Sequence, residues 1–423
     1  MDISTPSVYR SLSRDEINAI PLAELDVSSG YIFEDDTVGM YFERLRREAP
    51  VHYCARSRFG PFWSVTTYRH IMEVEVNHQA FSSDSALGGI TLAEPLPDER
   101  LPSFIAMDPP QHDEQRRTVS PIVAPGNLAL LEGTIRSRAA AILDGLPIGE
   151  EFDWVRRVSI ELTTQMLATL FDFPFEERSL LTWWSEMATG HPKARGAVTS
   201  WEQRREELGK CQAYFARLWN ERVNQPPRND LISMLAHSPA TRHMDERQFL
   251  GNVLLLIVGG NDTTRNSITG GLLALNRHPE QYRKLRENPA LVASLVPEII
   301  RWQTPLAHMR RTATRDVELG GQLIRKGDKV AMWYLSGNRD PEAIENPDAF
   351  IIDRARPRQH LSFGFGIHRC VGNRLAEMQL RILWEEILKR YPVIEVTGQP
   401  RRVLSNFVHG FMSMPVLIPA RAA

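Results

Sequence analysis

A cysteine stands just before a predicted helix, surrounded by glycines and basic side chains. The segment reads Phe363-Gly364-Phe365-Gly366-Ile367-His368-Arg369-Cys370-Val371-Gly372. Metals bind the thiolate form of cysteine, and a helix N-terminus beside His368 and Arg369 is expected to lower the pKa of the Cys370 thiol. Glycines at positions 366 and 372 would let the backbone approach a flat macrocycle and aim N–H groups at the sulfur. The pattern predicts a metal-binding thiolate, whereas Cys54 and Cys211 are predicted to be ordinary buried residues.

A second group of reactive residues lies in the middle of a long predicted helix, at Gly259-Gly260-Asn261-Asp262-Thr263-Thr264. Two glycines inside a helix destabilise it by about 1 kcal/mol each relative to alanine, which makes sense if a ligand lies against the backbone. Asp262 and Thr263 place an acid beside an alcohol, and such a pair can transfer protons. A phosphate-binding loop is the competing interpretation, but the run has no Gly-Lys-Ser/Thr and no strand before it.

Two helices are expected to carry these groups. The first runs from Asp245 to about His278, begins with a capping box formed by Asp245 and Gln248, and stops before a proline. At 1.5 Å per residue it would span roughly 50 Å, which is the width of a domain and indicates a central helix. The second follows Cys370 and ends near Tyr391, with apolar residues recurring at helical spacing.

The rest of the chain indicates a mainly α-helical protein with small β-sheets. Short strands are predicted at residues 51–55, 62–65 and 330–333. No internal repeat or flexible linker divides the 423 residues. We therefore expect an N-terminal extension over residues 1–30, followed by one large domain over residues 31–423.

Composition argues against several classes of protein. The formal net charge of −2 gives no reason to expect nucleic acid or an anionic membrane as a partner. No apolar stretch approaches the roughly 20 residues that a membrane helix needs, and the N-terminus lacks the apolar core of a signal peptide. The three cysteines are far apart, which predicts no disulfide framework. These features predict a cytoplasmic protein without a membrane anchor.

The cysteine segment resembles Phe-x-x-Gly-x-x-x-Cys-x-Gly, the haem-binding signature of cytochromes P-450. The rest of that family's pattern occurs in the same order over nearly the whole chain. Glu298-Ile299-Ile300-Arg301 resembles its Glu-x-x-Arg, and Arg354 would complete a buried Glu-Arg-Arg cluster. Pro297, directly before Glu298, is expected to kink that helix or to mark its first turn. The resemblance implies the cytochrome P-450 fold, a single large domain with a long central helix over the haem.

The resemblance also implies roles for individual residues. Cys370 would bind the iron of haem b (iron protoporphyrin IX), and a widened turn of the central helix would leave room for dioxygen. Asp262 and Thr263 would be the catalytic pair, with Thr263 hydrogen-bonding the oxygen and Asp262 relaying protons from solvent. The residues expected to contact the haem, with the histidines and arginines at its propionates, are His112, Arg116, Gly259, Gly260, Arg311, Phe363, Gly366, His368 and Cys370.

Three segments resemble one subgroup of the family, the bacterial terminal hydroxylases of n-alkanes and fatty acids. They are residues 257–267, 299–305 and 359–364. This likeness implies that the terminal methyl of a medium-chain alkane or fatty acid is converted to a primary alcohol, with O2 and two electrons. The hydrophobic substrate is expected to lie against apolar residues that include Ile90, Leu256, Leu306 and Phe411.

Five arginines and no acidic residue occur between positions 354 and 374. One interpretation is an ordinary basic surface. The other is a docking face for an acidic [2Fe-2S] ferredoxin, as the bacterial members of this family generally use. No fused reductase domain is expected, so a separate ferredoxin reductase would supply the ferredoxin with electrons.

Other assignments remain open at this point. The bacterial hydroxylases of steroid or terpenoid side chains resemble this chain in the segment Asp262-Thr263-Thr264-Arg265-Asn266 and also oxidise terminal methyls. A non-catalytic haem sensor would need the cysteine segment but not the acid and alcohol. Peroxide-driven relatives generally lack that pair and place an arginine where this chain has Gly-Gly-Asn.

Overall fold

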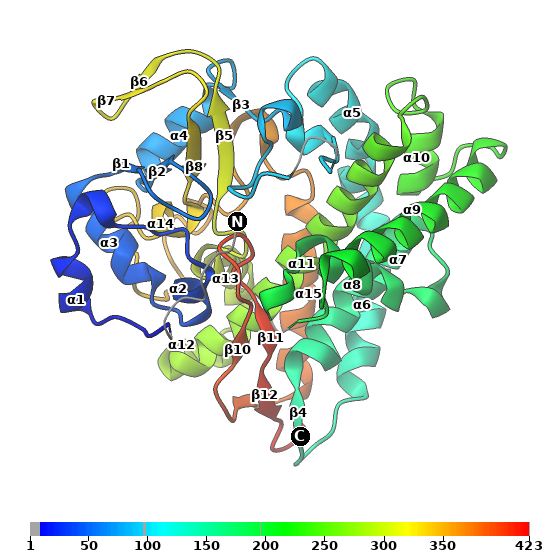
Figure 1. The fold of residues 1–423 in the computed structure, drawn as a ribbon. Coiled ribbons are helices and arrows are strands. Elements are labelled where there is room, and N and C mark those ends of the chain that lie inside the picture. The colour runs from blue at the N-terminus through cyan, green and yellow to red at the C-terminus, as the bar shows by residue number, and fades with distance from the viewer. Residues whose placement is uncertain (1–8, 96–98, 195, 423) are drawn as a thin grey trace.

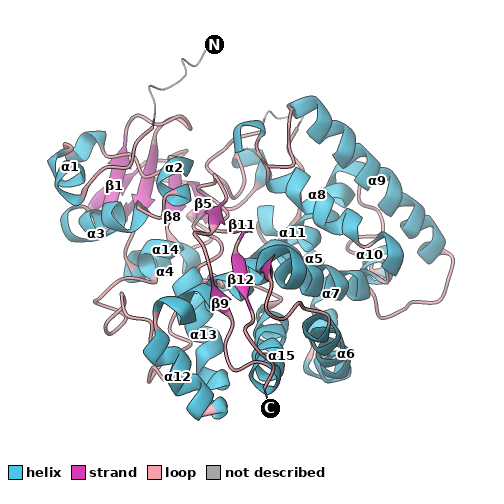
Figure 2. Cartoon of the chain, turned by 90° about the horizontal axis from the view of Figure 1, so that it is seen from below, coloured by secondary structure: helices cyan, strands magenta, loops and turns pink. Residues whose placement is uncertain are grey.

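Helices make up most of the molecule, and the largest sheet lies at one side of it (Figures 1 and 2). The computed structural model describes residues 9–95, 99–194 and 196–422. The α-helices are α1 (Arg14–Ala19), α2 (Gly30–Glu34), α3 (Val38–Glu48), α4 (Tyr68–Val76), α5 (Gln111–Val119), α6 (Pro125–Asp144), α7 (Glu161–Phe171), α8 (Ser179–Thr189), α9 (Trp201–Val223), α10 (Leu231–His237), α11 (Glu246–Arg277), α12 (Pro279–Glu287), α13 (Val292–Gln303), α14 (Tyr334–Gly337) and α15 (Asn373–Arg390). The strands are β1 (Val51–Cys54), β2 (Phe62–Val65), β3 (Phe81–Ser82), β4 (Glu151–Asp153), β5 (Met309–Ala313), β6 (Val317–Leu319), β7 (Gln322–Ile324), β8 (Lys329–Met332), β9 (Glu395–Val396), β10 (Arg401–Arg402), β11 (Phe411–Ser413) and β12 (Pro415–Leu417). The expected mainly helical architecture with small sheets is confirmed.

The central helix α11 passes through the helical part of the molecule (Figure 1). Its start is fixed locally, because the Asp245 carboxylate accepts a hydrogen bond from the backbone N–H of Gln248 at 2.8 Å. Most of its residues from Phe249 to Leu275 are buried, and the helix contacts α7, α8, α9, α13 and α15. The predicted helix and its cap are both confirmed, and α11 is surrounded as a central helix should be.

The Glu-x-x-Arg segment lies on α13 and forms the predicted cluster of buried charges. Glu298 accepts two hydrogen bonds from Arg301, at 2.7 and 2.8 Å, and two from Arg354, at 3.1 and 3.3 Å. Pro297 does not mark the first turn of this helix, because α13 already begins at Val292. Burying three charges is tolerable because the carboxylate and both guanidinium groups are hydrogen-bonded to one another. The cluster fixes α13 against the loop that leads to Cys370.

The largest sheet has the strand order β1-β2-β8-β5-β3. Its first two strands are antiparallel, with Val51 opposite Val65, and β8 pairs in parallel with β2. The strands predicted at 51–55, 62–65 and 330–333 are confirmed as β1, β2 and β8. Strand β5 pairs with β8 and carries Met309 and Arg311.

Residues 9–30, the described part of the predicted N-terminal extension, pack against the rest of the chain. Ile17, Leu25 and Val27 are buried in a hydrophobic cluster with residues of α3 and with Trp333. Arg44 on α3 donates hydrogen bonds to two carbonyl oxygens at the end of α1 and just after it. Residues 1–8 lie outside the described part. The extension thus shares the core of the domain, and the boundary at residue 30 stays a prediction.

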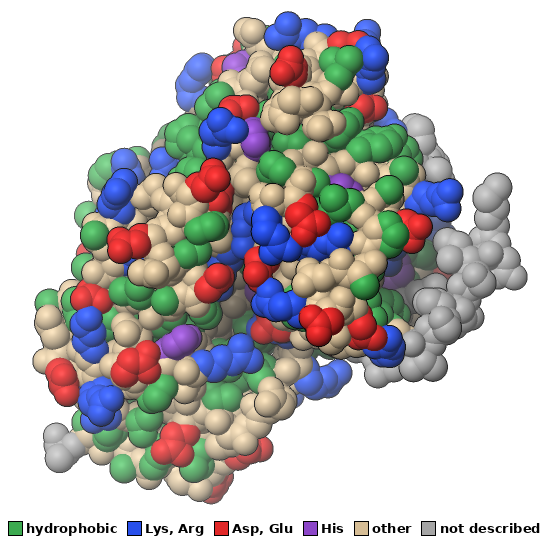
Figure 3. Space-filling view, turned by 90° about the vertical axis from the view of Figure 1, so that its left-hand side faces the viewer, with side chains coloured by type: hydrophobic (Ala, Val, Ile, Leu, Met, Phe, Trp, Pro, Cys, Tyr) green, Lys and Arg blue, Asp and Glu red, His purple; other side chains and the backbone are tan. Residues whose placement is uncertain are grey.

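The face formed by β1, α1 and α3 carries basic and acidic side chains side by side (Figure 3). Because the two signs are mixed, this face offers no single-sign field that would attract a charged partner. Among the described residues, none of the helices combines the length and apolar character that a bilayer span needs.

Candidate active site

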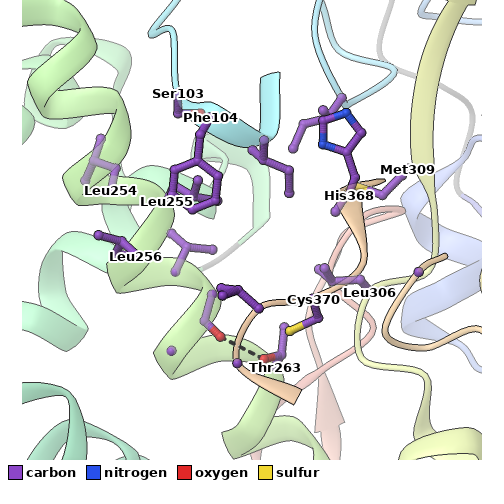
Figure 4. A pocket seen from close by; sticks show the side chains of 18 of the residues that line it. Ser103, Phe104, Leu254, Leu255, Leu256, Thr263, Leu306, Met309, His368 and Cys370 are labelled. Carbon is purple, nitrogen blue, oxygen red and sulfur yellow. Dashed lines mark hydrogen bonds between the residues drawn. The ribbon is translucent and has the colours of Figure 1, made fainter. Parts of the chain in front are cut away.

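A cavity of about 460 Å³ separates α11 from the loop that carries Cys370. On one side lie Leu254, Leu255 and Leu256 of α11, and on the other lie Leu306, Met309, His368 and Cys370 (Figure 4). Further apolar side chains come from segments far apart in the chain: Ile90, Leu101, Phe104, Ile105, Val119, Ile122, Met166, Leu167, Leu231, Leu375 and Phe407. The cavity therefore brings the predicted thiolate and the predicted oxygen-handling helix together inside apolar walls.

Cys370 is the cysteine whose side chain opens into this cavity, whereas Cys54 and Cys211 are buried in the core. Its backbone N–H donates to the carbonyl of Phe363 at 2.8 Å, which closes the loop before α15. Burial raises the pKa of the Cys370 thiol, although the N–H groups of Gly372 and Asn373 and two arginines act in the opposite direction. The expectation of a lowered pKa is thus wrong for the protein alone. A bound metal would favour the thiolate.

Gly366 serves a different purpose from the one predicted. Its backbone has φ +64°, and a Cβ there would lie 2.3 Å from the carbonyl oxygen of Glu75. The residue is therefore glycine because the loop packs closely on α4, and it is absent from the cavity lining. Gly372 does line the cavity, and a Cβ there would meet nothing within 4 Å.

His368 lines the cavity, whereas His112 does not line it but packs behind His368. The rings of His112 and His368 meet edge to face with their centroids 4.3 Å apart, and Ser83 Oγ is 3.0 Å from Nε2 of His368. Nε2 of His112 and Nδ1 of His368 are buried without a hydrogen-bond partner in the described part of the chain. Burial lowers the pKa of His112, and that of His368 to about 2. Buried polar atoms without partners indicate a missing anionic or polar ligand.

The predicted arginines also reach the cavity. Arg116 lines it and donates a hydrogen bond to the carbonyl of Arg369. Arg311 lines it as well, but its Nη2 is 2.8 Å from the carboxylate of Glu75, which is buried on α4. Glu75 also accepts a hydrogen bond from Tyr334. Sequence reasoning missed Glu75 because 236 residues separate it from Arg311 and no local pattern connects them.

The glycine pair and Thr263 line the α11 side of the cavity. A Cβ at Gly259 would meet nothing within 4 Å, whereas one at Gly260 would lie 2.8 Å from Leu167. The Thr263 hydroxyl donates to the carbonyl of Gly259 at 2.9 Å. The helix is α-helical throughout Glu246–Arg277, so the widened turn expected here is not observed. Space beside the helix instead comes from the missing side chain of Gly259.

Asp262 does not line the cavity. Its buried carboxylate accepts hydrogen bonds from Ser185 at 3.1 Å and Thr189 at 3.2 Å, and it lies 3.0 Å from Nη2 of Arg265. Successive residues of a helix point about 100° apart, so Asp262 and Thr263 have different surroundings. The acid is held between α11 and α8 and the alcohol borders the cavity.

Three of the four predicted substrate contacts, Ile90, Leu256 and Leu306, line the cavity, and their contact with substrate stays a prediction. The prediction that Phe411 lines the cavity is wrong. This residue is buried in the core, with the guanidinium of Arg402 4.7 Å from its ring centroid. Phe407, from the same C-terminal region, lines the cavity in its place.

Comparison with known proteins identifies the family. The model of the family described as cytochrome P-450 matches residues 159–418. The chain belongs to the cytochrome P-450 family. Linalool 8-monooxygenase of Pseudomonas putida is 37% identical over 389 residues, which cover 89% of this chain and 94% of that protein. Methyl-branched lipid omega-hydroxylase of Mycobacterium tuberculosis is 31% identical, over 94% of this chain and 95% of that protein.

Solved structures of cytochromes P-450 have the same fold. Cytochrome P-450-153 from Novosphingobium aromaticivorans matches with a TM-score of 0.87 and 47% identity, covering 93% of this chain and 99% of that chain. The fold is therefore the single-domain cytochrome P-450 fold that the cysteine signature implies.

Cytochromes P-450 bind haem b through a cysteine thiolate, and the cavity fits that cofactor. Cys370 offers its sulfur to the interior, and the open space at Gly259 and Gly372 leaves both walls free for a flat ring. The unpartnered atoms of His112 and His368 lie where polar groups of a ligand could satisfy them. Arg116 and Arg311 also line the cavity, and guanidinium groups suit the carboxylates of a haem.

Proposed function

We propose that this cytochrome P-450 hydroxylates the terminal methyl of medium-chain n-alkanes or fatty acids. One oxygen atom of O2 enters the product, which is a primary alcohol. The other oxygen atom takes up two electrons and two protons and leaves as water. The haem supplies the oxidising chemistry when bound. The residues of the chain hold it, orient the substrate, exclude water and deliver protons.

The observation that carries the proposal is the apolar wall around the space between Cys370 and α11. An alkyl chain offers no polar group near its end, so shape alone can present one carbon for reaction. Phe104 and Leu255 lie on one side of this space and Leu306 on the other (Figure 4). Terminal attack needs such confinement, because secondary C–H bonds are weaker and react more readily than primary ones.

We assign Cys370 as the iron ligand and the basic end of the cavity as the propionate site. His112, Arg116 and His368 supply donors there, and Arg311 contributes a charge that Glu75 already balances. Phe363, Gly259 and Gly260 border the same space and would contact the ring. Gly366 contributes indirectly, by letting the cysteine loop pack on α4.

We assign Thr263 and Asp262 to proton delivery. The Thr263 hydroxyl borders the cavity and can pass a proton inward while its oxygen is held near the carbonyl of Gly259. Asp262 is the acid behind it, and Arg265 connects Asp262 to Glu186, whose carboxylate is 3.7 Å from Arg265 and partly exposed. Protons would enter from this side of α8.

Electrons are proposed to come from a [2Fe-2S] ferredoxin and its reductase, with the enzyme in the cytoplasm. Of the five arginines at 354–374, Arg354 is turned inward to Glu298, while Arg356, Arg358, Arg369 and Arg374 are exposed. Arg358 is paired with Glu377 at 2.9 Å, which reduces its contribution to the surface potential. The remaining exposed charges are on the thiolate side and suit an acidic partner.

Terminal hydroxylation of a terpenoid or steroid side chain is the second candidate. It is favoured by the 37% identity to linalool 8-monooxygenase, whose name places its reaction on a terpenoid. Both candidates place a methyl group at the haem, and they differ in the shape of the remaining substrate.

Product analysis with a surrogate ferredoxin and reductase tests the proposal. Linear alkanes and fatty acids of graded length should give mainly 1-alkanol or ω-hydroxy acid, and linalool or a steroid should give little product. Leu306→Ala should widen the cavity and raise the share of subterminal alcohol, whereas Leu130→Ala on the exposed surface should not. Mainly subterminal alcohol from the wild type would refute terminal hydroxylation.

A further inference from the structure

The cavity carries more positive charge than the haem site uses. Its described lining contains four arginines, Arg100, Arg116, Arg204 and Arg311, and no Asp, Glu or Lys. The proposed propionate site accounts for Arg116 and Arg311. Arg100 and Arg204 are left over, and they come from the segment before Leu101 and from α9.

Neither of these two arginines forms an ion pair in the described part of the chain, although the carboxylate of Glu99 partly offsets the effect of burial on the pKa of Arg204. No carboxylate of the described chain lies within 4.0 Å of either guanidinium, although the neighbouring Arg205 is 3.8 Å from Glu99. Two N–H groups of Arg204 donate hydrogen bonds to backbone carbonyls at the end of α8, at 2.8 and 3.1 Å. Arg100 donates to the carbonyls of Ala86 and Pro95 at 2.7 and 3.4 Å. Each guanidinium keeps N–H groups free, because it has five donors.

Each of the two arginines is adjacent in sequence to an exposed residue, which indicates that they lie toward the outer end of the cavity. The ion pair between Glu99 and Arg205 joins the two segments next to the cavity arginines, and its side chains are 47% and 63% exposed. Burial lowers the pKa of Arg204. A guanidinium that is partly removed from water without an anion is unfavourable, and an anionic ligand would reverse this.

We propose that Arg100 and Arg204 bind the carboxylate of a fatty acid whose alkyl chain extends through the apolar cavity toward Cys370. This inference rests on the proposed function and narrows its substrate class to carboxylic acids. Fixing the acid at the outer end sets how far the chain reaches, so the ω-methyl is the carbon presented for oxidation. Guanidinium groups suit this role because they bind carboxylates through two parallel hydrogen bonds.

Binding of three twelve-carbon ligands to the holoenzyme tests the inference. Dodecanoic acid, methyl dodecanoate and n-dodecane share a chain but differ in charge, and each is titrated by the change in the haem spectrum and by calorimetry. The acid should bind the wild type most tightly. Arg204→Met and Arg100→Met should each weaken binding of the acid by about 10- to 100-fold. The affinities for the ester and the alkane should stay within about twofold of the wild-type values. Arg204→Lys should retain part of the acid affinity.

Arg205→Met is the matched control, because Arg205 is exposed, adjacent in sequence and absent from the cavity lining. Arg205→Met should leave the affinities for all three ligands close to the wild-type values. Equal binding of acid and ester by the wild type would overturn the inference. So would an equal loss for all three ligands in the cavity variants, since that result marks the arginines as anchors of α8 and the neighbouring loop. Wild-type products that are not terminal would refute the proposed function, while selective acid binding would still stand.

Discussion

The carboxylate of Asp262 lies 3.0 Å from Nη2 of Arg265, one turn further along α11. Arg265 in turn reaches the carboxylate of Glu186 on α8, at 3.7 Å. Burial raises the pKa of Glu186, which makes this carboxyl easier to protonate near the surface. The three side chains form a charged path from the outside of α8 to the residue that precedes Thr263.

If this path delivers protons, Asp262→Asn should slow product formation by about 10²-fold or more, because the amide cannot exchange a proton. The solvent isotope effect on turnover should increase at the same time. Turnover in H2O and D2O, with redox partners in excess, is the measurement. Glu161→Gln on the neighbouring α7 alters a surface ion pair with Arg178 and serves as control. Unchanged turnover in Asp262→Asn would place the proton path elsewhere.

Thr263→Ala should separate oxygen consumption from hydroxylation. NAD(P)H should still be consumed, but most of the oxygen should leave as hydrogen peroxide, because the hydroxyl at the cavity wall is lost. The quantity to determine is product formed per NAD(P)H consumed. Thr263→Ser keeps the hydroxyl and should retain much of the coupling. Equal coupling in the alanine variant and the wild type would show that this alcohol has no part in proton delivery.

His308 makes the stability of the protein depend on pH. Its ring is buried against Trp333, Nδ1 is 2.9 Å from the carbonyl of Asn406, and Nε2 has no partner in the described structure. Burial lowers its pKa from 6.5 to about 4. Between these values the unfolded chain binds a proton that the folded chain does not, so the free energy of unfolding falls as the pH drops from about 6.5 to about 4.

The loss in the free energy of unfolding that is due to His308 should reach about 3 kcal/mol at the acid end of this pH window. Urea unfolding of the wild type and of His308→Gln at several pH values measures it. The glutamine variant should lose less stability on acidification, since it cannot take up the proton. Parallel losses in the two proteins would mean that His308 does not titrate in this way.

Charge reversal should locate the docking face for ferredoxin. Arg356→Glu together with Arg358→Glu should raise the KM for an acidic ferredoxin and leave the haem spectrum unaltered. The effect should be largest at low salt, since screening acts over about 10 Å at 0.1 M ionic strength. Arg325→Glu, directly after β7, is the control, since this side chain is 65% exposed and paired with Asp316. If the double charge reversal leaves the KM for ferredoxin unchanged, ferredoxin docks on another surface.

Local patterns explain what could be predicted from the sequence. The start of α11 depends on a hydrogen bond between Asp245 and a backbone three residues away, and the loop at Cys370 depends on ten consecutive residues. Amphipathic spacing located α15 for the same reason. Such features depend on residues within one or two helical turns of one another, so they can be predicted without knowledge of the tertiary structure.

Long-range packing explains what was missed. Glu75 meets Arg311 only after α4 has packed beside β5, and Arg100 and Arg204 meet the cavity from separate loops and helices. Phe411 is the first residue of β11, pairs with Arg402 of β10 and is buried in the core, a position that its apolar character alone cannot specify. The role of Gly366 likewise depends on a backbone contact with α4, which a cysteine signature does not encode.

Substitution of the three cysteines tests the central claim, that Cys370 makes this cavity a haem-thiolate reaction centre. A thiolate ligand gives the reduced protein a strongly red-shifted band with carbon monoxide. Wild type, Cys54→Ala and Cys211→Ala should all show that band. Cys370→Ala should lose it, and Cys370→His should bind haem without it. A band retained in Cys370→Ala, or one lost when either buried cysteine is replaced, would contradict the account.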